Sequence, residues 1–185
     1  MSNNAKTVFL TVGPRGAGKS HYCKNVLVQN CGMVFVSRDE IMMQRYGTVH
    51  TPYGAGHPEA LETVRALLHQ HLSGDAGRDI VLDVWNGTSK ERKELIAVSR
   101  SYGAEEVIAL YFVTPVEYVE RWFWLKPGVA KASEWKMRQG QECVFFSKDA
   151  PRNDYELFHE WATDIDSDGF DRVLIVNPLQ QELSV

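Results

Sequence analysis

The sequence has few cysteines and no recognisable metal-binding spacing. Its three cysteines, Cys23, Cys31 and Cys143, are odd in number and form no C-x-x-C pair, so neither a disulfide framework nor a zinc knuckle is expected and buried thiols are favoured. His69 and His71 are two residues apart. On a helix they would point about 200 degrees apart, which excludes a shared metal ion.

The chain also has no long apolar run and no large excess of charge. No stretch of about 18 apolar residues is present to form a transmembrane helix, and the start MSNNAKTVFLTV leads directly into a strand pattern rather than a signal sequence. We therefore expect a soluble cytoplasmic protein with no membrane partner. The net charge is -4, so a nucleic-acid substrate would need a local basic site.

What the chain does contain is enough apolar sequence for one core. It has 185 residues, of which 44% are hydrophobic, and this favours a single domain over residues 1–185. Apolar strand patterns at 7–12, 33–37, 79–83, 106–113 and 172–176 alternate with helical patterns. The alternation predicts an α/β fold of three layers, with a five-stranded, mainly parallel sheet between helices.

Helix starts are marked by local signals. Ser37 with Glu40, and Thr88 with Glu91, have the spacing of capping boxes, and the segment from Thr114 has a similar pattern. Between the second and third strands, a helix is predicted with Leu61, Val64, Leu67, Leu68 and Leu72 on one face. Residues 125–160 give no clear pattern and include five positive charges between Lys126 and Lys148.

The segment GPRGAGKS at residues 13–20 satisfies G-x-x-x-x-G-K-[ST] between a predicted strand and a predicted helix. Glycines there let backbone amides wrap phosphate oxygens, and the helix N-terminus adds positive potential. Lys19 would bridge the terminal phosphates, and the Ser20 hydroxyl would bind Mg²⁺. The predicted nucleoside triphosphate site comprises Gly13, Arg15, Gly16, Ala17, Gly18, Lys19, Ser20 and His21.

Two acidic residues lie at or just after the ends of predicted strands. Asp83 ends the third strand, where it could hold Mg²⁺ directly or through water, and Asn86 could share that site. Asp39 follows the second strand in VSRDE. Each aspartate could have a purely structural role: Asp39 could stabilise the helix through its dipole, and Asp83 could cap a loop. The alternative is a role in catalysis or metal binding.

Four segments, GPRGAGKS, VSRDE, IVLDVWN and DSDGFDRVLIV, together resemble the P-loop polynucleotide kinase family and related zeta-toxin-like kinases. The resemblance implies that Asp39 is the general base, with Arg38, Asp83 and Asn86 beside the acceptor. It also implies a helical lid after strand four, at about 122–150. Cations of that lid would assist Lys19 in stabilising the migrating phosphoryl group; the candidates are Arg121, Lys126, Lys131, Lys136 and Arg138.

One position departs from the family pattern. Bacteriophage polynucleotide kinases resemble this chain but have an arginine three residues after the base, where this chain has Met42. The acceptor pocket is therefore expected to be more apolar, with Arg45 as one conceivable replacement. Aromatic residues in 121–125 and Trp135 could stack on a base or serve as packing.

The sequence thus predicts a phosphotransferase that uses ATP and Mg²⁺. The leading acceptor is a polynucleotide hydroxyl, at a 5' end or on a hydroxymethylated base as in DNA modification. A small-molecule kinase acting on a nucleoside, sugar or nucleotide sugar is the alternative. A third possibility is a nucleotide-dependent switch or ATPase. For that class we would expect a group that positions water, and no carboxylate after strand two. The preference between ATP and GTP and the oligomeric state stay open.

Overall fold

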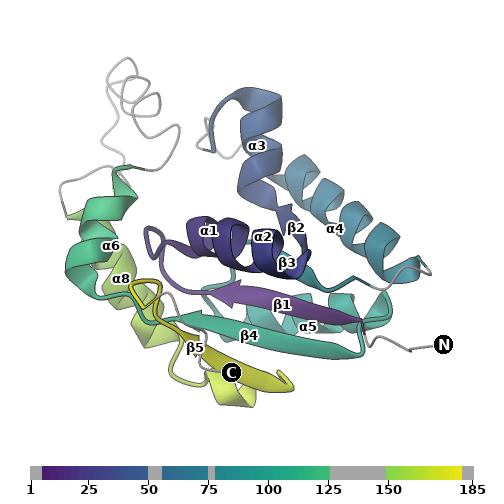
Figure 1. The fold of residues 1–185 in the computed structure, drawn as a ribbon. Coiled ribbons are helices and arrows are strands. Elements are labelled where there is room, and N and C mark those ends of the chain that lie inside the picture. The colour runs from purple at the N-terminus through teal and green to yellow at the C-terminus, as the bar shows by residue number, and fades with distance from the viewer. Residues whose placement is uncertain (1–5, 50–55, 75–77, 126–148, 181–185) are drawn as a thin grey trace.

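The central feature of the fold is a five-stranded parallel sheet. The computed structural model describes residues 6–49, 56–74, 78–125 and 149–180. The sheet order is β2-β3-β1-β4-β5, and every neighbouring pair is parallel (Figure 1). This confirms the predicted α/β class and the sheet. The strands are β1 (Thr7–Val12), β2 (Val34–Ser37), β3 (Ile80–Asp83), β4 (Glu106–Phe112) and β5 (Arg172–Val176).

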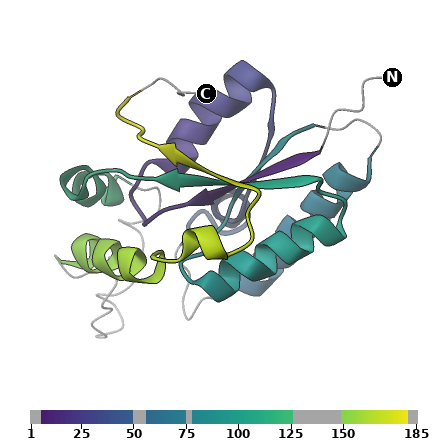
Figure 2. The same cartoon turned by 90° about the horizontal axis from the view of Figure 1, so that it is seen from below.

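Helices lie on both faces of this sheet. Figure 2 shows the α1–α2 segment on one side and α4 and α5 on the other. No helix among the described residues is long and apolar enough to cross a membrane. In chain order the helical elements are α1 (Lys19–Tyr22), the π-helical η1 (Cys23–Val28), α2 (Gln29–Cys31), α3 (Arg38–Tyr46), α4 (His57–Ser73), α5 (Ser89–Ser101), α6 (Val116–Phe123), α8 (Ala150–Trp161) and the 3-10 helix η4 (Ile165–Ser167).

Two apolar clusters, one on each face, hold these layers together. The first joins β1 and β3 to α3, α4, α5 and α8, and the second joins the sheet to α1, η1 and α6. Central strands are apolar on both faces, as a covered parallel sheet requires. Helix α4 buries Val64, Leu68 and Leu72, as predicted, whereas Leu61 is 38% exposed and does not belong to its buried face.

The predicted helix caps are only partly confirmed. Thr88 and Glu91 form the complete capping box of α5. At α3, Ser37 accepts a hydrogen bond from the Glu40 backbone amide at 3.4 Å, but the Glu40 carboxylate pairs with Lys24, so the second half of the box is missing. The Thr114 hydroxyl does not cap α6, whose N-cap is Pro115.

The segment that the sequence left unassigned contains helix α8. Helix α8 follows the predicted lid positions Lys126, Lys131, Lys136 and Arg138 and the candidate stacking residue Trp135, all of which lie outside the described residues. The expectation of buried thiols holds for Cys23 but is wrong for Cys31, which is exposed. Cys143 lies outside the described residues.

Candidate active site

The glycine loop after β1 has glycines at the positions where its backbone has positive φ angles. Gly16 and Gly18 have φ angles of 85° and 79°, a region that residues with side chains rarely adopt. Helix α6 also leaves no room there. A Cβ on Gly16 would lie 2.7 Å from the Val119 carbonyl oxygen, and one on Gly18 would lie 2.9 Å from Cζ3 of Trp122. The loop is therefore shaped by its glycines and packed directly against α6.

Hydrogen bonds to its carbonyl oxygens stabilise the conformation of the glycine loop. Lys19 donates from Nζ to the carbonyl oxygens of Gly13 and Pro14, both at 2.8 Å. The Thr114 hydroxyl donates to the Ala17 carbonyl at 2.8 Å. These bonds satisfy carbonyl groups of the loop. They place the Lys19 ammonium at the rim of the loop, where a point charge can meet phosphate oxygens.

Asp83 lies next to Ser20, as the combined metal prediction requires. The Ser20 hydroxyl donates to Asp83 Oδ2 at 2.5 Å, and the Thr11 hydroxyl donates to Oδ1 at 2.8 Å. Asp83 is buried, at 7% exposure. A hydroxyl and a carboxylate in direct contact are hard oxygen ligands of the kind that Mg²⁺ prefers. The residues present therefore fit a magnesium site, although Thr11 was not part of the prediction.

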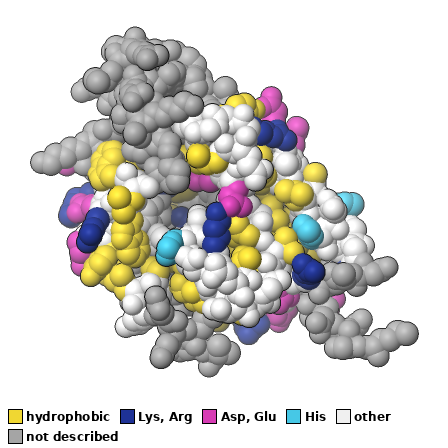
Figure 3. All heavy atoms as spheres, turned by 45° about the horizontal axis from the view of Figure 1, so that its top comes forward, with side chains coloured by type: hydrophobic (Ala, Val, Ile, Leu, Met, Phe, Trp, Pro, Cys, Tyr) yellow, Lys and Arg dark blue, Asp and Glu magenta, His cyan; other side chains and the backbone are white. Residues whose placement is uncertain are grey.

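Asp39 stands at the same edge of the sheet. In the β2–β3 register Ser37 faces Asp83, so α3 begins beside the end of β3. Arg38 donates to Asp39 Oδ1 from Nη2 at 2.6 Å and from Nε at 3.2 Å, and both side chains are partly exposed. In Figure 3, acidic and basic side chains lie together near the centre of the view. The guanidinium thus fixes the orientation of the candidate base.

The remaining predicted site residues are placed differently. Asn86 is 3% exposed, and its amide donates to the carbonyl oxygens of Thr11 at 2.7 Å and Val84 at 3.2 Å. This packing supports the loop after β3 and does not favour direct contact with an acceptor. His21 is exposed beside Asn25. Arg121 is exposed in the last turn of α6.

The position that departs from the family pattern is a core position. Met42 is completely buried in the apolar cluster under α3 and α4. The expectation that Met42 makes the acceptor pocket more apolar is therefore wrong, because its side chain belongs to the core. Arg45 donates from Nη2 to the Thr63 hydroxyl of α4 at 2.8 Å. That contact ties α3 to α4.

Two titratable groups around the site have shifted pKa values. Burial raises the pKa of the Cys23 thiol far above its usual value, and the negative charge of Asp83 adds to the shift. The thiol is protonated and unsuited to act as a nucleophile. Burial, followed by the positive charge of Arg38, lowers the pKa of His57. His57 is therefore neutral at physiological pH.

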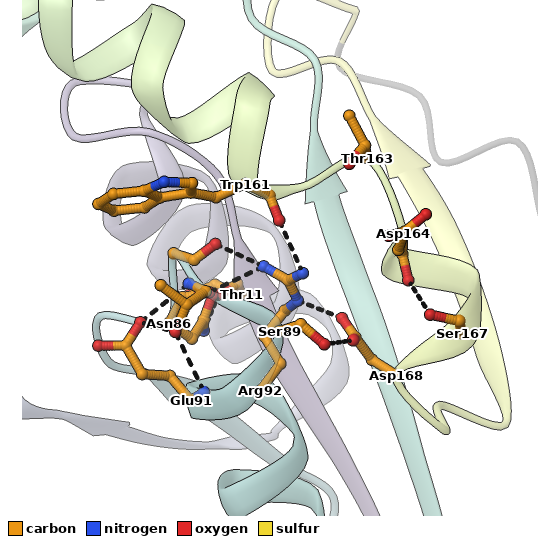
Figure 4. Close-up of polar contacts among 12 residues, drawn as sticks. Thr11, Asn86, Ser89, Glu91, Arg92, Trp161, Thr163, Asp164, Ser167 and Asp168 are labelled. Carbon is orange, nitrogen blue, oxygen red and sulfur yellow. Dashed lines mark hydrogen bonds and ion pairs between the residues drawn. The ribbon is translucent and has the colours of Figure 1, made fainter.

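A buried arginine that the sequence analysis did not identify supports the loop after β3. Arg92 is 0% exposed and forms an ion pair with buried Asp168 (Figure 4). In the sequence, Arg92 sits in a run of charges typical of an exposed helix turn, so no local signal marks it. Its other contacts are the carbonyl oxygens of Gly87 at 2.6 Å, Asn86 at 3.3 Å and Trp161 at 3.2 Å, while the Ser89 hydroxyl also donates to Asp168.

The chain matches one family model over most of its length. The model AAA_33, described as an AAA domain, covers residues 8–150. A search of curated proteins gave no match.

Solved structures with the same fold include kinases. One is a chain of the Pnkp1/Rnl/Hen1 RNA repair complex, with TM-score 0.58 and 17% identity over 86% of this chain and 47% of that chain, so this chain spans about half its length. A fungal RNA kinase has TM-score 0.52 and 16% identity over 100% of this chain and 78% of that chain. Shikimate kinase from Acinetobacter baumannii, in complex with shikimate, has TM-score 0.52 and 15% identity over 94% of this chain and 85% of that chain. At these identities the likeness establishes the fold alone.

Proposed function

This chain belongs to the AAA_33 family, and from that premise we propose that it is a P-loop kinase that transfers the γ-phosphate of ATP to an acceptor hydroxyl. The observation that carries the proposal is the contact between Ser20 and Asp83 beside the loop, with Asp39 at the end of the adjacent strand. A phosphate cradle, oxygen ligands for a metal and a carboxylate for the acceptor meet at one sheet edge, as phosphoryl transfer requires.

Each of these residues has a definite role in the proposed reaction. Loop amides and Lys19 bind the phosphates, and Ser20 and Asp83 would hold Mg²⁺, which would neutralise phosphate charge. Asp39 accepts the proton of the acceptor hydroxyl as its oxygen attacks the γ-phosphorus. The bond from that phosphorus to the bridging oxygen breaks, and ADP leaves. Arg121 is proposed to approach the donor phosphates from α6.

We propose a polynucleotide as the acceptor, phosphorylated at a 5'-hydroxyl end or on a hydroxymethylated base in DNA. Support comes from the fold shared with an RNA kinase and with a chain of an RNA repair complex. A small-molecule acceptor is the second candidate, because the same fold occurs in a shikimate kinase that was solved with its small substrate. The chain would act as a single domain over residues 1–185, with residues 122–150 as a lid.

The base assignment is tested with Asp39→Asn. We expect loss of labelled phosphate transfer to every acceptor with unchanged affinity for ATP, because the amide cannot accept the proton. Glu40→Gln is the matched control, since Glu40 lies in the same helix turn but pairs with Lys24. Normal turnover by Asp39→Asn would overturn the assignment.

The acceptor is tested by incubating the wild-type protein with labelled ATP and a panel of acceptors. The panel comprises 5'-hydroxyl oligonucleotides, hydroxymethylated DNA, nucleosides and sugars. Transfer to an oligonucleotide, with binding that weakens steeply as salt rises, is the expected result because phosphate contacts release counterions. Transfer to small molecules alone would replace the polynucleotide proposal with the second candidate.

A further inference from the structure

A buried carboxylate of α8 reaches the third residue of the glycine loop. The Asp154 side chain is 5% exposed, and Arg15 contacts both of its oxygens. The Arg15 backbone amide donates to Oδ2 at 3.1 Å, and Nε donates to Oδ1 at 2.9 Å. Nη2 completes a close ion pair with Oδ1. One carboxylate thus holds both the main chain and the side chain of Arg15.

Aromatic rings confine the same guanidinium. Its central carbon lies 5.6 Å from the ring centre of Trp85, in the loop after β3, and 5.9 Å from that of Phe123, at the end of α6. Such contacts favour a cation, and they restrict its movement. Arg15 is therefore positioned by three separate elements of the fold.

Helix α8 is itself anchored away from Asp154. At its other end, the Trp161 carbonyl oxygen accepts a hydrogen bond from buried Arg92 at 3.2 Å. Phe158, between these points, is 1% exposed in the core. Asp154 consequently projects from a helix whose place is set by independent contacts, and it can act as a fixed support for the loop.

We propose that Asp154 and Arg15 form a positioning pair that holds the loop in the shape that binds triphosphate, an inference that rests on the proposed function. The carboxylate satisfies the Arg15 amide, and this sets the direction of the chain as it enters Gly16 and Gly18. A loop held in its binding shape loses less entropy when phosphate binds. The pair acts through the loop, because the Asp154 carboxylate accepts hydrogen bonds from the main chain of Arg15 as well as from its side chain.

The test compares Asp154→Asn with Arg152→Gln on the same helix. Arg152 pairs with Glu120 at 2.7 Å on the surface and is the matched control. For Asp154→Asn, we expect the Kd for MgATP, measured by calorimetry, to rise about tenfold or more, because a charged hydrogen bond of this kind is lost. Arg152→Gln should bind MgATP as the wild type does.

A kinetic comparison separates positioning from a general structural defect. Because the loop binds ground state and transition state alike, KM for ATP should rise in Asp154→Asn with kcat changed less than about twofold. A lower kcat at unchanged KM, or a wild-type Kd in folded protein, would overturn the proposal. If Asp154→Asn does not fold, Arg15→Lys replaces it. Lysine keeps the positive charge but lacks the planar set of donors with which arginine contacts a carboxylate. We therefore expect about threefold weaker binding of MgATP, and wild-type affinity would overturn the proposal.

The binding assay needs no acceptor, which separates this inference from the proposed function. If wild-type protein binds MgATP but transfers phosphate to no acceptor, the proposed function fails and the comparison of variants still decides the role of Asp154. If the wild type does not bind MgATP, both proposals fail.

Discussion

Replacing Arg92 with leucine tests how strongly the buried polar network supports the fold. Arg92 is 0% exposed and donates hydrogen bonds to Asp168 and to three backbone carbonyl oxygens. Leucine removes all of these donors. Within the described residues, Asp168, which is 4% exposed, then keeps only the Ser89 hydroxyl as a side-chain partner.

The expected cost follows from that unpaired charge. Removing one partner of a buried ion pair costs about 3–5 kcal/mol, because the other charge stays away from water. Protein domains have a free energy of unfolding of about 5–15 kcal/mol. The change would therefore remove a large part of the stability, and for a chain of this size it would lower Tm by about 6–20 °C.

Urea unfolding followed by tryptophan fluorescence measures this loss, since the chain has five tryptophans. Arg100→Gln is the control, because Arg100 forms an exposed pair with Asp171 at 2.8 Å, and such pairs contribute about 0–1 kcal/mol. The double variant Arg92→Leu with Asp168→Leu should be more stable than Arg92→Leu alone, because it buries no charge. A loss below about 1 kcal/mol for Arg92→Leu would refute the reasoning.

Three further predictions concern the glycine loop, the candidate metal ligand Asp83 and Asp171 just before the edge strand β5. Gly18→Ala should weaken MgATP binding in calorimetry, because the loop has φ 79° there, whereas Gly32→Ala, at φ 66° with open space around it, should leave binding unchanged. Thr11→Val should lower the free energy of unfolding by about 1–3 kcal/mol in a urea titration, because Asp83 loses a buried donor. The Val107 amide, aided by Arg100, lowers the pKa of Asp171, so its stabilisation is present above the unfolded-state pKa of about 4 and is lost as pH falls through the lower folded pKa. When the pH is lowered from neutral to acidic, the Tm of Asp171→Asn should therefore fall less than the Tm of the wild type. An equal fall in both proteins would contradict the prediction.

The sheet could be predicted because its signal is local. Strands β1, β3 and β4 are short apolar runs that the fold covers on both faces, and their bounds agree with the prediction to within one residue. Helix α8 was missed because its apolar residues do not mark its buried face. The buried positions Ala150, Pro151, Asp154 and Phe158 have helical spacing, but one of them is a carboxylate, while Leu157 and Trp161 are substantially exposed.

The phosphate loop could likewise be anticipated, since one continuous segment encodes it. Its supporting residues could not, because their contacts join distant parts of the chain. Thr11 reaches Asp83 across 72 positions, and Arg15 reaches Asp154 across 139. No local pattern marks such partners; the only hint was a threonine inside the apolar first strand. Met42 shows the opposite failure, because the resemblance suggested a pocket position where this chain buries the side chain in its core.

The contacts of these supporting residues form one continuous chain of polar groups, which starts at the predicted pair of Ser20 and Asp83. Ser20 donates to Asp83, which also accepts from the Thr11 hydroxyl. The Thr11 carbonyl accepts from Asn86, whose own carbonyl accepts from Arg92. Each link joins a different element, and all but Ser20 are buried. Because a buried polar group without its partner is costly, each member fixes the next. This explains why Asn86 lies behind the candidate metal ligands: its amide ties the end of β1 to the loop after β3, so that Asp83 stays in place.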